Sequence, residues 1–109
     1  MKGVTKAMAE KKKFYRVSTA SKIINMPERT LHGYIKAIER ETSYRFYRKT
    51  MFYHSNKVNQ VFLTEEEIPV LTELRRIREL DLLPMRLAIY KLFDPEKYRE
   101  YTDFESQIL

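Results

Sequence analysis

The side chains best suited to chemistry lie in residues 28–40, where hydrogen-bond donors recur at a helical spacing. Offsets of 0, 3, 4, 7 and 11 define one continuous helical face, made of Arg29, His32, Gly33, Lys36 and Arg40. Such a face can donate hydrogen bonds to base edges and phosphates. A solvated face of an ordinary helical hairpin is the alternative interpretation.

The same composition offers little for catalysis. The two histidines, His32 and His54, are 22 residues apart, and no HExxH spacing occurs. With only Gly3 and Gly33, a glycine-rich phosphate loop is impossible. Cysteine is absent, which excludes a disulfide and a thiolate metal site. We therefore expect no enzyme, no cofactor and no bound metal.

Charge is divided unevenly along the 109 residues. Residues 1–63 contain 14 Lys/Arg and 4 Asp/Glu, a net charge of +10, whereas residues 64–109 contain 7 and 11, a net charge of −4. A basic half beside an acidic half favours a surface that faces a polyanion. No apolar run is long enough to cross a bilayer and no signal-peptide core is present, so we expect a cytoplasmic protein.

Two short helices around a tight turn must position the basic face. Ser18 is a suitable N-cap for a helix that begins at Thr19, and Asn25 suits a left-handed helix end. Pro27 fits the first turn of the second helix, residues 28–40. This arrangement predicts a helix-turn-helix whose second helix lies in a DNA major groove.

The apolar residues of the two helices predict how they pack. Leu31, Ile35 and Ile38 form a buried stripe, with Tyr34 at its margin. We expect Ile23 and Ile24 of the first helix to pack against that stripe.

Residues 44–63 change in character and predict a β-hairpin. Aromatic and β-branched residues flank the turn-forming segment HSNK, which places the tip near Ser55 and Asn56. The segment has no acidic residue and contains four basic ones, Arg45, Arg48, Lys49 and Lys57. Basic side chains interleaved with aromatic ones can bind a phosphate backbone, or the rings can simply cover a small core.

The acidic half predicts further helices. Thr64 and Glu67 form a capping box before a helix in which Pro69 causes a slight distortion. A last short helix begins at Pro84 and is stopped by Asp94-Pro95. The remaining residues either form a short docked helix through Tyr98, Tyr101, Phe104 and Ile108, or fray.

The order helix, turn, helix, hairpin, helix, short helix resembles the DNA-binding domain of MerR-like winged-helix proteins, including the excisionases. YRVSTASKIINMPERTLHGYI (residues 15–35) resembles the opening helix-turn-helix of that family, with PERTL in place of Ser-x-Arg-Thr-Leu. VFLTEEEIPVLTELRRIRELDLLPMRLAIYKLF (residues 61–93) resembles the segment after the family's wing. The resemblance covers roughly residues 15–93.

The resemblance implies specific roles. Arg29 matches the family's DNA-contacting arginine, Thr30 its neighbouring hydroxyl, and His32 stands where a second arginine is frequent. Tyr34 matches an aromatic residue that packs near the backbone, and Arg48 and Lys49 fall in the wing. Set out in full, the expected DNA-binding residues are Arg29, Thr30, His32, Gly33, Tyr34, Lys36, Arg40, Arg45, Arg48, Lys49 and Lys57.

The chain also departs from the family pattern. The wing is longer, and Asp81 replaces a common glycine. Neither the long dimerising helix nor the effector domain of MerR regulators is present, so we expect no small-molecule effector and a monomer in solution.

The sequence thus predicts a mainly α protein with a β-hairpin wing (α+β), a MerR-like winged helix-turn-helix. An internal pseudo-repeat, two helical pairs around a central hairpin, is an architectural variant. We expect a basic arm (1–13), a DNA-binding domain (14–93) and a C-terminal tail or short docked helix (94–109).

The expected function is sequence-specific binding of double-stranded DNA, by a small transcriptional regulator or an accessory protein of Gram-positive conjugative plasmids, such as the TraN type. An excisionase-like recombination factor is the nearest alternative. An RNA-binding module and a protein adaptor docking through the tyrosine-rich tail are alternatives from other classes.

Overall fold

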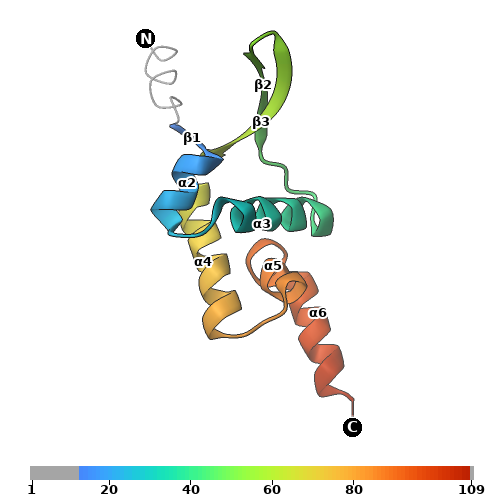
Figure 1. Ribbon diagram of the computed structural model, residues 1–109. Coiled ribbons are helices and arrows are strands. Elements are labelled where there is room, and N and C mark those ends of the chain that lie inside the picture. Colours follow the sequence, from blue (N-terminus) through green and yellow to red (C-terminus); the bar gives the residue numbers. More distant parts are fainter. Residues whose placement is uncertain (1–12, 109) are drawn as a thin grey trace, which may run out of the picture.

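The computed structural model describes residues 13–108, which form an α+β fold of helices and one antiparallel sheet (Figure 1). The described elements, in chain order, are β1 (Phe14–Arg16), α2 (Val17–Ile24), α3 (Glu28–Glu41), β2 (Tyr47–Tyr53), β3 (Asn56–Thr64), α4 (Glu67–Leu80), α5 (Met85–Phe93) and α6 (Pro95–Ser106). The predicted order of helical pair, hairpin and helical pair is confirmed. The predicted arm lies outside the described residues, apart from Lys13.

The sheet has three strands in the order β1-β3-β2, and both pairings are antiparallel. His54 and Ser55 form a two-residue turn with φ values of 50° and 71°, so the tip lies one residue earlier than predicted. The sequence did not predict β1. Three residues become a strand only because they pair with residues 62–64 along the edge of β3 that lies opposite β2.

The helices enclose one apolar core on one side of the hairpin's base (Figure 1). Its largest fully buried side chains come from α3, β3, α4 and α5, and are Leu31, Ile35, Ile38, Leu63, Leu71, Leu74, Ile77 and Ile89. The predicted stripe of α3 is therefore confirmed. Tyr34 is only 7% exposed, so it belongs to this core and does not lie at its margin.

The start of α2 differs from the prediction. The helix begins at Val17, with Arg16 as N-cap, so Ser18 is not the capping residue. The chain passes directly from β1 into the helix, because Arg16 is still extended and ends the strand. Ile24 is buried as predicted, but Ile23 is 54% exposed and makes no part of the core.

The junction between β3 and α4 uses half of the predicted capping box. The Glu67 carboxylate accepts a hydrogen bond of 2.7 Å from the backbone N–H of Thr64, but Thr64 ends β3 and α4 begins at Glu67. Pro69 falls in the first turn, where its missing N–H would have no partner, and the helix is continuous. The Tyr44 hydroxyl also donates to Glu67, and burial together with this carboxylate raises the pKa of Tyr44.

The C-terminal residues form a helix. As predicted, α5 ends at Phe93, and α6 begins at Pro95. The two helices contact through Tyr90 and Tyr101, whose ring centroids are 6.3 Å apart. Phe104, further along α6, is largely exposed.

Candidate nucleic-acid interface

The turn between α2 and α3 fixes where α3 begins. Asn25 has a φ of 64°, the left-handed conformation predicted for it. Its backbone N–H donates to Lys22 O (3.2 Å), and that of Met26 donates to Ser21 O (2.9 Å), which is a Schellman pattern. Met26 is buried beneath this turn, and Pro27 then precedes α3. Local backbone chemistry therefore sets the angle between the two helices.

Tertiary contact reinforces the turn. The Arg75 guanidinium of α4 donates to the carbonyl oxygen of Ile24 at 2.8 Å and also to that of Asn25. These carbonyls lie at the C-terminal end of α2, where the helix dipole favours a cation. The end of α2 is thus anchored to α4, and α3 is held against a rigid support.

The predicted basic face of α3 is oriented away from the core. Because the stripe around Leu31, Ile35 and Ile38 is buried, the opposite side of the helix faces solvent. Exposed there are Arg29, Thr30, Gly33, Lys36 and Arg40, with His32 partly covered. The five residues that the helical spacing grouped on one face therefore lie on one side of α3, together with Thr30. Tyr34, also expected among the DNA-binding residues, is buried in the core.

Two of the basic side chains on this face have intramolecular neighbours at its ends. Arg40 Nε donates to Glu41 at 3.1 Å, and His32 Nε2 lies 3.7 Å from a carboxylate oxygen of Glu28. Arg29 and Lys36 differ, because within residues 13–108 their side chains have no hydrogen bond or ion pair. They are the cations of α3 that are available to a ligand.

Gly33 lies between them on the exposed side. A Cβ built at this glycine would meet nothing within 4 Å, so the fold does not require glycine here. Glycine in a helix interior is less favourable than alanine by roughly 0.5–1 kcal/mol. Glycine at this position therefore lowers the stability of the helix, but it allows a ligand to approach the helix backbone closely.

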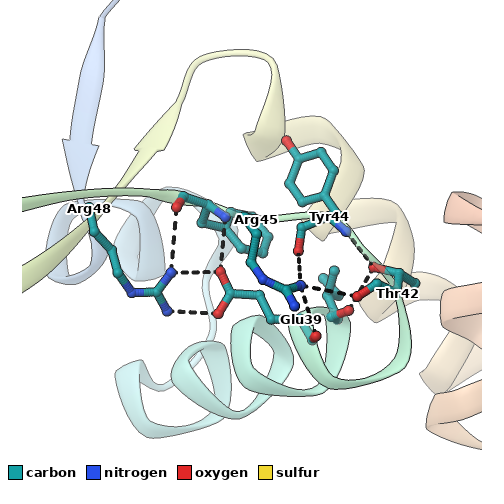
Figure 2. A network of polar contacts seen from close by, with 7 residues as sticks. Glu39, Thr42, Tyr44, Arg45 and Arg48 are labelled. Atoms are coloured by element: carbon teal, nitrogen blue, oxygen red, sulfur yellow. Dashed lines mark hydrogen bonds and ion pairs between the residues drawn. The ribbon is translucent and has the colours of Figure 1, made fainter.

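The hairpin is fixed to α3 by one carboxylate (Figure 2). Arg48 donates two hydrogen bonds of 2.7 Å to Glu39, one to each carboxylate oxygen. Glu39 also accepts the backbone N–H of Phe46 at 2.9 Å. The hydrogen bond from Arg48 is the main cause that lowers the pKa of Glu39, and burial opposes it. The Arg48 side chain therefore joins β2 to α3.

The Arg45 side chain is also held by hydrogen bonds within the protein. Its Nη1 donates to the carbonyl oxygens of Glu39, Thr42 and Tyr44, at 2.9, 3.0 and 2.8 Å (Figure 2). Two of these carbonyls belong to the end of α3 and the residue after it, which have no partners in the helix itself. The sequence placed Arg45 and Arg48 among phosphate-binding residues, but nothing in local sequence reveals that α3 supplies their acceptors.

The remaining hairpin lysines lie on opposite faces of the sheet. Residues directly paired across antiparallel strands share a face, so Lys57 lies beside Phe52, and Lys49 beside Gln60. Arg48 is on the Lys57 side and contacts α3, which defines that side as the inner sheet face. Lys49 is on the outer sheet face. Within the described chain, neither lysine has a hydrogen bond or ion pair.

A polar hollow of about 380 Å³ separates α3 from the inner sheet face. It is lined at the α3 side by Glu28 and His32, and at the hairpin side by Arg48 and residues 58–61. The hollow makes the start of α3 and the hairpin two walls of one concave surface. Nothing in the sequence indicated that these walls lie together, since they belong to separate segments of the chain.

Comparison with known proteins adds no identification. No family model matches the chain, and neither curated proteins nor solved structures gave a significant match. None of the described helices combines the length and the apolar character needed to cross a bilayer. The interpretation of the site therefore rests on its own chemistry.

Proposed function

We propose that the protein binds double-stranded DNA sequence-specifically, with α3 in the major groove and the hairpin on the adjacent backbone. The observation that carries the proposal is the solvent-facing side of α3, where Arg29 and Lys36 have no partner in the described chain and flank an unobstructed Gly33. A major groove admits one α-helix, and an arginine can donate two hydrogen bonds to a guanine edge.

The position of each residue suggests a division of labour. Arg29 lies in the first turn of α3, the part of a recognition helix that reaches base edges. Lys36 lies two turns further along, where phosphates flank the groove. Gly33 allows the helix axis to approach closely between them. Arg29 therefore supplies specificity, and Lys36 supplies charge.

The hairpin has a narrower role than its composition predicts. The hairpin protrudes from the helices (Figure 1). Lys57 lies near its turn on the inner sheet face and is the cation best placed to contact phosphate. Arg45 and Arg48 act through the protein itself, because they set the hairpin's position relative to α3. The order of elements and the resemblance to MerR-like proteins support a winged helix-turn-helix interpretation of this arrangement.

The biological role that fits best is a small DNA-binding regulator or a conjugative-transfer accessory protein, and an excisionase-like role uses the same contacts. The exposed basic side of α3 favours nucleic acid over a protein adaptor. Monomeric behaviour in solution stays a prediction.

Selection from a random duplex library with the purified full-length chain tests the proposal. We expect enrichment of a short common sequence, and tighter binding of that duplex than of its scrambled form in fluorescence titrations. Recovery of duplexes with no shared sequence, all bound equally, would contradict specific recognition. Equal binding of duplex DNA and duplex RNA would argue against groove reading by α3, because side chains cannot read the deep, narrow major groove of RNA.

A further inference from the structure

The outer sheet face has a hollow that the proposed duplex contacts do not use. It is about 360 Å³ and is lined by Phe14, Tyr47, Lys49, Met51 and Phe62, from all three strands. Phe14 and Tyr47 are 47% and 48% exposed. The core lies on the other side of the sheet, where Leu63 is buried, so these rings are not needed to fill it.

The rings form a continuous platform. The centroids of Phe14 and Tyr47 are 4.8 Å apart with an interplanar angle of 35°, and those of Tyr47 and Phe62 are 6.4 Å apart with an angle of 56°. Tyr47 is thus the central ring, with an aromatic neighbour on either side. Partly exposed aromatic rings each offer a face on which a planar group can stack.

Cations adjoin the platform. Lys49 lines the hollow itself, and Arg16 lies on the same face, where its guanidinium donates to the Tyr53 hydroxyl at 3.1 Å. None of the three strands contains an aspartate or glutamate. The three strands therefore contribute basic groups and no acidic ones to this face.

We propose that the outer sheet face binds single-stranded nucleic acid, with about two bases stacked on Tyr47 and its neighbours and their phosphates beside Lys49 and Arg16. Base stacking on aromatic rings combined with cations along the backbone is how sequence-tolerant single-strand binding is achieved. An apolar protein partner would match the rings but would desolvate Lys49 without compensation. Paired DNA cannot use the rings in this way, because its bases are already stacked on each other.

The proposal is independent of duplex binding by α3, because the two surfaces lie on opposite sides of the sheet. Arg48, which contacts α3, projects from the inner sheet face, whereas Tyr47 and Lys49 project from the outer one. A single strand and a duplex could therefore be held together by one protein molecule.

Fluorescence anisotropy with the full-length chain tests this proposal, using labelled oligothymidylate and oligouridylate of about 15 nucleotides. We expect wild type to bind at least one probe, and preference between them distinguishes DNA from RNA. Tyr47→Ala should weaken binding by about 5- to 150-fold, the loss expected for one stacked base. Tyr47→Phe should retain the affinity, because it keeps the ring.

Phe52→Ala is the matched control, since Phe52 is 67% exposed on the inner face of the same hairpin. It should change binding less than twofold, and urea unfolding of each variant checks that the fold is kept. Failure of wild type to bind either probe would overturn the proposal. Equal losses in Tyr47→Ala and Phe52→Ala would overturn it too, even if duplex recognition were intact.

Discussion

Glu39 and Arg48 form a bidentate ion pair, with two N–O distances of 2.7 Å, that joins α3 to β2. The side chain of Glu39 is 14% exposed and that of Arg48 35%. Both elements belong to the proposed DNA interface. The ion pair therefore fixes the orientation of the protruding hairpin relative to α3.

Glu39→Gln should destabilise the fold by about 1–3 kcal/mol, since it weakens charged hydrogen bonds to Arg48 and to the Phe46 N–H in a mostly covered site. Urea denaturation at neutral pH measures the change. The control is Glu73→Gln, because Glu73 pairs with Arg76 on the exposed surface of α4 and such pairs contribute about 0.3–0.5 kcal/mol. Equal effects of the two substitutions would contradict the structural role of Glu39.

Acid should remove the contribution of Glu39. Its pKa is lowered in the folded protein, chiefly by the hydrogen bond from Arg48, so its stabilising contribution is complete above its ordinary pKa of 4.5. The contribution is lost as the pH falls through the lower folded pKa. The difference in unfolding free energy between wild type and Glu39→Gln should therefore be constant from pH 7 to about 5 and shrink below 4.5. A difference that grows on acidification would be inconsistent with a lowered pKa.

Gly33→Ala should separate stability from DNA binding. We expect a gain of about 0.5–1 kcal/mol in the free energy of unfolding, because the added Cβ meets no neighbour within 4 Å. We also expect weaker binding of duplex DNA, because the helix can no longer approach as closely. Thr72→Ala is the control. It also places alanine, the better helix former, on the exposed side of a helix, α4, but leaves the proposed DNA interface unaltered. Unchanged DNA affinity in Gly33→Ala would place Gly33 outside the contact.

The salt dependence of duplex binding should identify the hairpin residue that contacts phosphate. Lys57→Ala should make the slope of log affinity against log salt shallower by about 0.9, the value for one lost phosphate contact. Arg99→Ala, an exposed change on α6, should leave the slope unchanged. If Lys57→Ala also kept the parent slope, the hairpin would not contact the DNA backbone.

Local chemistry allowed several elements to be predicted. Asn25 before Met26-Pro27 predicted a left-handed helix end, and the 3–4 spacing of Leu31, Ile35 and Ile38 predicted the buried side of α3. These signals act within a few residues of the chain. A turn motif or a helical stripe has the same physical meaning whatever surrounds it.

Features that depend on distant partners could not be predicted. β1 exists only through pairing with the end of β3. Ile23 is exposed because α2 buries the stripe of Val17, Ala20, Ser21 and Ile24, and Ile23 falls outside that stripe. Arg45 and Arg48 read as free cations in the sequence, but carbonyls and a carboxylate of the α3 region accept their hydrogen bonds. The charge of the site could be predicted, but not which of its cations remain available.

The most direct test of the account is the ratio of affinities for a selected duplex and its scrambled form, measured for wild type, Arg29→Ala and Arg29→Lys. Loss of a bidentate arginine contact should cost roughly 1–3 kcal/mol on the selected duplex, and much less on the scrambled one. Arg29→Lys should lose the ratio but keep the non-specific affinity, because it retains the charge and not the two-pronged donor. Equal losses on both duplexes in Arg29→Ala would make Arg29 a phosphate contact and contradict base reading by α3.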